Sequence, residues 1–275
     1  MEKEKSIEAN IKVHSKLANT YNEDEPHYKK ESVARVSLIL NEFLNKTSKV
    51  ADFGCGTGFI IDIIKDEVSE IVGVDITEEM LSRVTKGSSE LKLIKSDVVE
   101  ANLPSSYFDL VTAYSFLDHV YDLSAVFKKA YDVLKNGGVF YADLNPNKQF
   151  WNTFKTASNF NNEILSKEFN GVSNKTSELE EKYQINSETF IQAEYSKHVD
   201  GGFDSSQLKH LLELAGFREI QFIYHWFAGE SIIINDTEID KTVRFQNATT
   251  ISEHLTKLLP ISNNLFKYIG FKAIK

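Results

Sequence analysis

The sequence predicts an α/β fold in which a doubly wound, mostly parallel sheet carries helices on both faces. Short apolar runs alternate with amphipathic helical patterns from residue 49 onward, which is the first observation behind that prediction. The second is a glycine-rich turn, Gly54–Gly58, that directly follows the run Val50–Phe53. The third is an acidic residue at the end of the next run, Ile71–Asp75. Strands that alternate with helices pair in parallel, because each crossover helix returns the chain to the same edge of the sheet.

Length, composition and charge limit the possible functions. The chain has 275 residues with 41% hydrophobic residues, which suits one large domain or a domain with an insertion. Its net charge of −9 argues against nucleic acid as a partner, since phosphate binding needs a basic face. Cys55 is the only cysteine, so an internal disulfide and a cysteine-based metal cluster are excluded. The chain has no apolar run of about 20 residues and no apolar stretch after Met1–Lys5, so we expect a cytoplasmic protein with no membrane span.

The elements follow one another in an order typical of this fold class. Residues 1–20 suggest a short helix, Tyr21–Tyr28 an acidic loop interrupted by a proline, and Lys29–Asn45 an amphipathic helix. The predicted strands are Val50–Phe53, Ile71–Asp75, Leu91–Lys95, Phe108–Tyr114, Val139–Leu144, Glu219–Phe227 and Tyr268–Ile274. The predicted helices between them are Phe59–Asp66, Glu78–Thr85 with Thr77 as N-cap, Leu123–Leu134 ended by Asn136–Gly138, a helix capped by Asp204 and ended by Gly216, and one near Ile251–Leu259.

The regular alternation breaks between residues 147 and 202. This stretch is rich in Asn, Ser, Thr and Glu but also carries the aromatic residues Phe150, Trp151, Phe154, Phe160, Phe169, Tyr183, Phe190 and Tyr195. A linker has no need of so many aromatics, so we expect an inserted cap. The predicted division is an N-terminal helical segment over the ligand site (1–46), a core (47–146 and 203–275) and a substrate cap (147–202).

The glycine turn points to a nucleotide-like small molecule, and its spacing narrows the choice. Dinucleotide-binding proteins use Gly-x-Gly-x-x-Gly, in which a helix N-terminus receives the pyrophosphate. Here the glycines are Gly54, Gly56 and Gly58, and position 59 is a phenylalanine, so the dinucleotide spacing does not fit.

The chain resembles the class I S-adenosylmethionine-dependent methyltransferases at five places in order. Asp52–Gly58 matches the family's first motif, an acid, one residue and Gly-x-Gly-x-Gly. Further matches are Gly73–Leu81, Ser96–Val98, Phe108–Val111 and Leu134–Gly138. The resemblance covers residues 30–145 and extends to the unit at 204–227. It implies a seven-stranded sheet whose last strand is antiparallel.

The resemblance also implies which residues bind the cofactor, S-adenosylmethionine, with no metal. Asp75 would accept both ribose hydroxyls, and Asp52 would contact the α-amino group directly or through water. Ile76 and Met80 would form the walls of the adenine site, and Asp97 would accept from the adenine amine. The full predicted cofactor set is Tyr21, Asp52, Phe53, Gly54, Cys55, Gly56, Gly58, Asp75, Ile76, Met80, Ser96, Asp97, Val98 and Tyr114. Tyr28 is an alternative to Tyr21 as the residue that folds over the cofactor.

Chemistry at the acceptor is less defined. Methyl transfer needs alignment of the nucleophile, exclusion of water and, for a hydroxyl or an amine, removal of a proton. His119 is the candidate base, because it follows the fourth strand in a Leu-Asp-His-Val segment similar to the Leu-Glu-His-Val of quinone-biosynthesis methyltransferases. A structural or cofactor-side role for His119 stays open, and His198 and His225 are weaker candidates.

The resulting hypothesis is a methyltransferase acting on an O, N or C nucleophile of a small-molecule metabolite. A protein or RNA methyltransferase and a catalytically silent cofactor-binding protein are the alternatives, and a nicotinamide-dependent oxidoreductase is disfavoured by the glycine spacing. The fourth strand lacks the Asn/Asp-Pro-Pro-Tyr/Phe segment of many amino-group modifiers of nucleic acid and protein, reading Thr112–Ser115 instead. The sequence leaves the acceptor and the oligomeric state open, a homodimer included.

Overall fold

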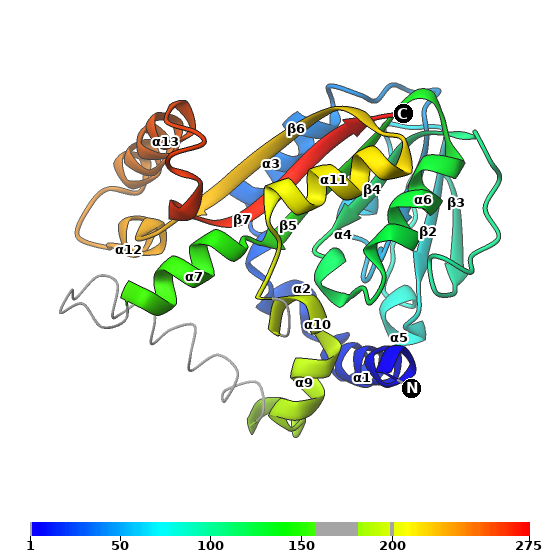
Figure 1. Ribbon diagram of the computed structural model, residues 1–275, viewed down its shortest axis with the longest axis horizontal. Coiled ribbons are helices and arrows are strands. Elements are labelled where there is room, and N and C mark those ends of the chain that lie inside the picture. The colour runs from blue at the N-terminus through cyan, green and yellow to red at the C-terminus, as the bar shows by residue number, and fades with distance from the viewer. Residues whose placement is uncertain (1, 158–180, 199–200) are drawn as a thin grey trace.

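A seven-stranded sheet organises the computed structural model, which describes residues 2–157, 181–198 and 201–275. The strands lie in the order β3-β2-β1-β4-β5-β7-β6 (Figure 1). Their bounds are β1 Lys49–Phe53, β2 Glu70–Asp75, β3 Glu90–Lys95, β4 Phe108–Tyr114, β5 Leu134–Pro146, β6 Arg218–Phe227 and β7 Phe266–Ile274. The order reverses beside β1, so β1 and β4 flank the switch point where a doubly wound sheet binds its ligand.

Strand direction confirms the predicted fold class. Strand β1 pairs in parallel with β2 and with β4, with Val50 opposite both Ile71 and Leu110. Strand β7 inserts between β5 and β6 and runs antiparallel to both. Six strands therefore end at one edge of the sheet, and the predicted antiparallel last strand is present.

Helices cover both faces of the sheet. Their bounds are α1 Glu2–Leu17, α2 Tyr21–Asp24, α3 Lys30–Leu40, α4 Phe59–Ile64, α5 Glu78–Leu81, α6 Leu123–Val133, α7 Lys148–Ala157, α9 Ser187–Ala193, α10 Tyr195–His198, α11 Ser205–Ala215, α12 Glu230–Asn235 and α13 Lys241–Lys257. One core lies under α6 and α11 and contains Phe127, Phe140 and Phe271. The other lies under α3 and α4 and contains Leu40 and Ile61. Side chains of the buried central strands point alternately to the two faces of the sheet, so the same strands contribute residues to both cores.

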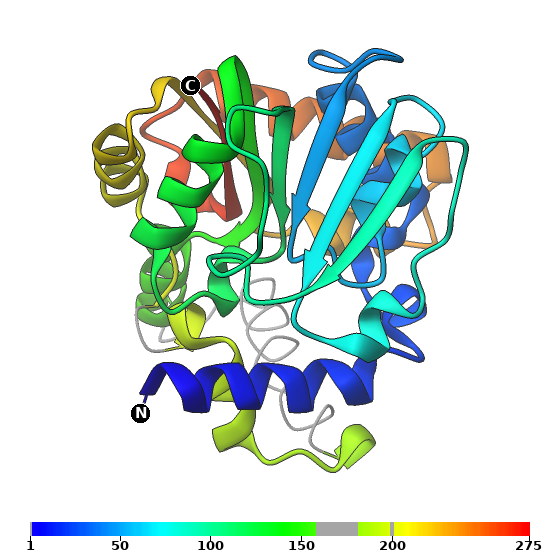
Figure 2. The same cartoon turned by 90° about the vertical axis from the view of Figure 1, so that its right-hand side faces the viewer.

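A third, smaller core joins the N-terminal helix α1 to helix α9. Ala9 and Val13 of α1 pack against Phe190 and Ala193 of α9, and Ile185 completes the buried set. Figure 2 shows α1 lying across the ends of the strands, with α9 on its outer side. Helices α1 and α9 thus share an apolar interface that is separate from the cores of the sheet.

Several predicted boundaries are wrong. Helix α3 ends at Leu40, five residues early, and α5 ends at Leu81. Helix α13 begins at Lys241, ten residues before the predicted helix, because the Asp240 carboxylate caps it by accepting from the backbone N–H of Thr242 and Val243. Because α13 is mostly polar, its sequence shows no clear helical spacing of apolar residues.

Local hydrogen bonding explains three further differences. The predicted loop Tyr21–Tyr28 forms α2 and a short 3₁₀ helix, Pro26–Tyr28, separated by an extended Glu25 as expected before a proline. Thr77 begins α5, but its side chain makes no capping bond. The segment Asn136–Gly138 lies inside β5 rather than ending α6, and the N–H of Gly137 donates to the carbonyl of Lys275.

Candidate active site

A pocket lies where the carboxyl ends of β1, β2, β3 and β4 meet under α1. It encloses about 1050 Å³ of space, part of it open to solvent. Twelve of the predicted site residues line it: Tyr21, Gly54, Cys55, Gly56, Asp75, Ile76, Met80, Ser96, Asp97, Val98, Tyr114 and His119. This is a suitable size for a drug-sized ligand, which typically occupies a cleft of about 300–1,000 Å³.

The glycine turn forms the floor of the pocket. Gly54 and Gly56 have φ of 67° and 53°, a region that residues with a Cβ seldom adopt. The N–H groups of Gly54 and Cys55 both donate to the carbonyl of Val74, at 2.8 and 3.1 Å, which ties the turn to β2. A Cβ at position 54 would overlap the ring of Phe116. The turn therefore holds backbone, rather than side chains, against the pocket.

Asp75 stands at the end of β2 with each carboxylate oxygen bound by a backbone N–H group. Its Oδ2 accepts from the N–H of Gly56 at 2.9 Å, and its Oδ1 accepts from the N–H of Thr77 at 2.8 Å. Burial raises the pKa of Asp75, and these two backbone N–H groups together with the side chain of Thr77 oppose the rise. A carboxylate has about four acceptor positions, so acceptor capacity remains for a ligand.

Three predicted cofactor residues, Asp52, Phe53 and Gly58, are not among the residues that line the pocket. Phe53 points into the core, and Gly58 begins α4 with a φ of 95°. Asp52 is 2% exposed, and the hydroxyl of Thr112 donates to its Oδ1 at 2.7 Å. Burial raises the pKa of Asp52 to about 7, because no cation lies against the carboxylate to offset its lost hydration.

The opposite wall comes from the segments after β2 and β3. Met80 and Val98 are buried apolar residues at the pocket surface. Asp97 accepts from the N–H of Val99 at 2.9 Å through Oδ1, while its Oδ2 lies 3.5 Å from the Lys3 ammonium of α1. Asp97 therefore links the pocket wall to the helix above it.

Aromatic residues close a third side. The ring of Tyr114 packs against Phe59 with centroids 4.6 Å apart, and its hydroxyl accepts from Arg35 at 3.3 Å. The ring of Tyr21 lies 6.4 Å from that of Tyr28, whose hydroxyl meets the hydroxyl of Thr57 at 2.5 Å. Burial raises the pKa of Tyr21, so this phenol stays protonated at neutral pH. Both tyrosines considered for the covering role thus border the pocket.

The sequence predicted a covering N-terminal segment, but no residue of α1 was identified as a site residue. Residues at helical spacing on one face of α1 line the pocket: Lys3, Ile7, Asn10 and His14, with Ser6 beside them. Their spacing of three and four was visible in the sequence. Their mixed chemistry gave no sign of a ligand, however, and the partners of this face lie more than 180 residues away.

His119 lies in the pocket wall with both ring nitrogens near acceptors. Its Nδ1 is 2.9 Å from the carbonyl oxygen of Ala193, and its Nε2 is 3.8 Å from Oδ1 of Asp118. A carbonyl oxygen only accepts, so Nδ1 carries the hydrogen, and in the neutral ring the lone pair is on Nε2. Nε2 is therefore the atom of His119 that can take a proton.

The cap differs from the expectation of an aromatic pocket wall. No described residue of 181–198 lines the pocket. Phe190 and Tyr183 pack on α1 instead, and Phe160 and Phe169 fall outside the described residues. His225 is buried away from the pocket, with Nε2 at 3.2 Å from Oδ1 of Asp143, and the side chain of His198 is outside the described part of the chain.

The described residues contain neither a metal-binding group nor a membrane-spanning helix. Within residues 2–157, 181–198 and 201–275, no three His, Cys, Asp or Glu side chains gather as a metal-binding group. No helix among the same residues combines the length and apolar character needed to cross a bilayer.

Comparison with known proteins finds a family match that includes the glycine turn. Residues 51–142 match a family described as a methyltransferase domain. The ubiquinone biosynthesis O-methyltransferase of Idiomarina loihiensis is 32% identical over 110 residues, which are 38% of this chain and 45% of that protein. The sterol 24-C-methyltransferase of Aspergillus fumigatus is 34% identical over 99 residues, or 34% of this chain and 26% of that protein. The chain thus spans less than half the length of these relatives.

The fold is shared over a longer stretch. A solved S-adenosylmethionine-dependent methyltransferase from Archaeoglobus fulgidus matches with a TM-score of 0.52 at 21% identity, over 89% of this chain and 95% of that one. At 21% identity this likeness shows the fold alone. The evidence for a methyltransferase domain comes from the family match to residues 51–142. Residues 51–142 thus form a methyltransferase domain, of the class whose members depend on S-adenosylmethionine.

Proposed function

We propose that this protein transfers a methyl group from S-adenosylmethionine to an O, N or C nucleophile of a small-molecule metabolite. The observation that carries the proposal is the arrangement of Asp75 beside the glycine turn. Its remaining acceptor capacity suits a ribose diol, and Gly54 and Gly56 leave room for the amino-acid part of the cofactor. Ile76 and Met80 supply apolar surface for adenine, and Asp97 an acceptor for its amine.

The buried residues behind the pocket wall support the cofactor indirectly. Asp52 would attract the cationic amino group through water or across the glycine turn, because its carboxylate has no cation of its own. Phe53 and Gly58 would act by fixing that turn. The bound cofactor supplies an activated sulfonium methyl group, so the protein itself has to position the acceptor, exclude water and remove a proton where the acceptor has one.

Enclosure of the pocket supports a small acceptor. Helix α1 covers the side away from the glycine turn, and Tyr21 and Tyr114 close the aromatic side. The net charge of −9 disfavours nucleic acid. The named relatives methylate oxygen in one case and carbon in the other, so the acceptor atom stays open. His119 would accept the proton of a hydroxyl or an amine through Nε2.

We also propose the predicted division of the chain, with one change that the contacts support. Helices α1 and α2 act as the cover, whereas α3 belongs to the core because Val36 and Leu40 are buried beneath the sheet. The cap from 147 to 202 would select the acceptor. A cytoplasmic location is proposed as well, and the single cysteine is compatible with a reducing compartment.

Calorimetric titration with S-adenosylmethionine, S-adenosylhomocysteine and nicotinamide cofactors tests the proposal. We expect binding of the first two only. Asp75→Ala should weaken S-adenosylhomocysteine binding about 100-fold, because two hydrogen bonds to a charged acceptor are lost. Glu70→Gln is the matched control, since Glu70 lies at the opposite end of the same strand β2 and should leave the affinity unchanged.

The outcomes separate the competing functions. Absence of binding to both sulfur compounds would reject the methyltransferase assignment, and unchanged affinity in Asp75→Ala would reject the ribose contact. Binding without turnover across a panel of small hydroxyl, amine and carbon acceptors would favour a silent binding protein or a macromolecular substrate.

A further inference from the structure

The carbonyl oxygen of Ala193 is a meeting point of three segments that are distant in sequence. It belongs to the last residue of α9, where backbone carbonyls have no partner within the helix. It lies 3.1 Å from the amide Nδ2 of Asn10 and 2.9 Å from Nδ1 of His119. The preceding carbonyl, that of Gln192, accepts from the hydroxyl of Ser6 at 3.0 Å.

We propose that Asn10 is a positioning residue for His119, acting through the Ala193 carbonyl to present the Nε2 lone pair of His119 to the pocket only when α1 and α9 cover it. This inference rests on the proposed function. The side-chain amide of Asn10 in α1 donates to the carbonyl, and Nδ1 of His119, next to the sheet, donates to the same oxygen.

The oxygen fixes the tautomer of His119. A carbonyl cannot donate, so the hydrogen of a neutral His119 ring must be on Nδ1 as long as the contact exists. Without the contact, either nitrogen could carry the hydrogen, and Nε2–H would be drawn to Oδ1 of Asp118 at 3.8 Å. A hydrogen on Nε2 would make that atom useless as a proton acceptor.

Neighbouring charges do not replace this constraint. The ring of His14 packs edge-on at 4.8 Å from that of His119. Burial lowers the pKa of His14 to about 4, so this ring is neutral at pH 7 and adds no charge. Asp118 is buried beside His119, and the carboxylate of Asp75 acts on His119 from β2. Both carboxylates attract N–H groups and do not select one nitrogen of His119. The hydrogen bond to the carbonyl therefore determines which nitrogen keeps the lone pair.

Helices α1 and α9 move as one unit in this proposal because they share their own apolar core. Val13 and Phe190 are buried against each other's helices and touch neither core of the sheet. Polar contacts tie α1 and the adjoining helix α10 to the rest of the molecule: the Ser15 hydroxyl of α1 donates to Glu79, and the Ser196 hydroxyl of α10 donates to the carbonyl of Val120. Polar contacts of this kind can open without unfolding the sheet.

Nitrogen NMR of the whole protein tests the proposal without knowledge of the acceptor. Protein labelled with ¹⁵N-histidine would be studied at about pH 8, where ordinary histidines are neutral. Spectra would be taken with and without S-adenosylhomocysteine, and the His119 signals identified by their loss in His119→Asn. We expect wild-type His119 as the Nδ1–H tautomer, and a measurable Nε2–H population in Asn10→Ala.

Ser6→Ala is the matched control, because it removes a similar bond between α1 and α9 that does not touch His119. It should leave the tautomer of His119 unchanged. An Nε2–H tautomer in the wild type would overturn the proposal, even if Asn10→Ala failed to fold. So would an Asn10→Ala spectrum identical to that of the wild type.

A second comparison uses the substituted residue itself. The side-chain amide of His119→Asn can donate to the Ala193 carbonyl, whereas His119→Ala cannot. We expect His119→Asn to keep the wild-type affinity for S-adenosylhomocysteine and His119→Ala to lose about fivefold. Equal affinities in both variants would contradict the proposed contact between His119 and the Ala193 carbonyl. A wild type that binds no S-adenosylhomocysteine would instead contradict the proposed function, and the tautomer would still be readable in the free protein.

Discussion

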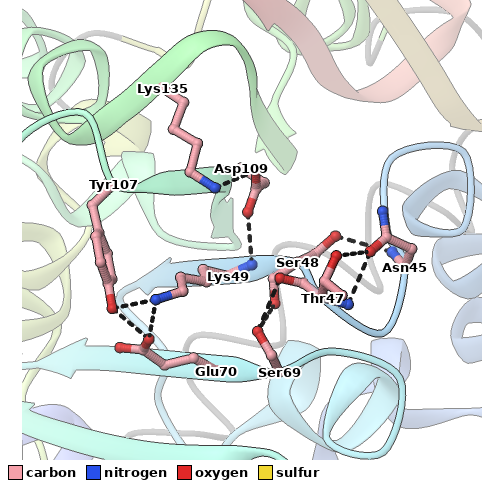
Figure 3. Close-up of polar contacts among 9 residues, drawn as sticks. All are labelled: Asn45, Thr47, Ser48, Lys49, Ser69, Glu70, Tyr107, Asp109 and Lys135. Carbon is pink, nitrogen blue, oxygen red and sulfur yellow. Dashed lines mark hydrogen bonds and ion pairs between the residues drawn. The ribbon is translucent and has the colours of Figure 1, made fainter.

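The two ends of the sheet hold similar polar side chains in opposite states. At the amino end, shown in Figure 3, each charge faces a partner within the chain. The Lys49 ammonium lies 2.5 Å from the Tyr107 hydroxyl and 3.2 Å from Glu70, and the Lys135 ammonium donates to Asp109 at 2.7 Å. The other oxygen of Asp109 accepts from the backbone N–H of Lys49 at 2.9 Å.

At the carboxyl end, Asp52 and Asp75 near the ends of β1 and β2 have no such partners in the described part of the chain, whereas Asp143 of β5 is paired with the Arg35 guanidinium at 2.9 Å. No ammonium or guanidinium group is recorded within ion-pair distance of Asp52 or Asp75 among the described residues, and burial raises the pKa of both. Asp118 has a buried Oδ1 that accepts no hydrogen bond. This difference indicates that carboxylates without a partner, rather than charged residues in general, identify the site. A buried carboxylate without a partner costs stability unless a ligand supplies the missing interaction.

The largest expected effect comes from filling the glycine turn. In Gly54→Ala the new Cβ overlaps the Phe116 ring at a φ of 67°, so both the turn and the ring must move. We expect S-adenosylhomocysteine affinity to fall about 100-fold or more, since a shift of about 1 Å at a binding turn has effects of that order. Calorimetry measures the affinity and thermal unfolding measures the accompanying loss of stability.

Gly137→Ala at the amino end separates strain from overlap. Gly137 also has a positive φ, 79°, but a Cβ there would meet nothing within 4 Å. It should cost about 1–2 kcal/mol of stability and leave the affinity unchanged. Equal affinities for the wild type and Gly54→Ala would show that the turn does not touch the ligand.

An intermediate effect is expected from Asp52→Asn, read as a pH dependence of stability. The folded pKa of about 7 exceeds the ordinary value of 3.8, so the folded state binds more protons between these values. Wild-type stability should therefore fall as the pH rises through this window and then level off. Asparagine does not titrate, so the stability of Asp52→Asn relative to the wild type should rise by an amount on the order of 3 kcal/mol from pH 4 to pH 8.

Urea unfolding of both proteins across that range measures the difference, and other titrating groups cancel in the comparison. Thr112 can still donate to the oxygen of the asparagine, so the local hydrogen bond is kept. A difference between the two proteins that does not vary with pH would show that the pKa of Asp52 is not raised in the folded state.

The smallest effect is expected at the amino end. Glu70→Gln removes the charge that faces Lys49 but leaves an acceptor for the Tyr107 hydroxyl. We expect the melting temperature to fall by at most about 2 °C, because partly exposed ion pairs contribute little. Differential scanning calorimetry measures it. A large loss here would mean that the amino end, rather than the core, carries the stability of the sheet.

The sequence was sufficient for the sheet because its signals are local. Each strand is a short apolar run, and the glycine turn with Asp75 one strand later identifies the ligand edge. The seven strands and the antiparallel direction of the last one came from the family resemblance, and the observed pairings confirm both. Boundaries were weaker where hydrogen bonds to neighbouring strands compete with the helix, as in Asn136–Gly138.

The upper half of the site was not predictable, because its contacts are made between distant segments. Nothing local to Asn10 indicates that its amide meets the carbonyl of Ala193, 183 positions away. The tautomer of His119 depends on a backbone oxygen, and backbone atoms leave no trace in residue identity. Asp52 carried the motif of a ligand contact, but strand geometry placed its side chain behind the turn.

The interface between α1 and α9 has a consequence for the order in which the protein matures during synthesis. Helix α1 leaves the ribosome first, yet the bonds from Ser6 and Asn10 reach partners 186 and 183 residues later. At about 5–20 residues per second, α1 waits for roughly 10–40 seconds before α9 exists. During that interval the glycine turn and β1 to β5 can fold with the pocket open. A newly made molecule would therefore gain its ligand-binding edge before its cover.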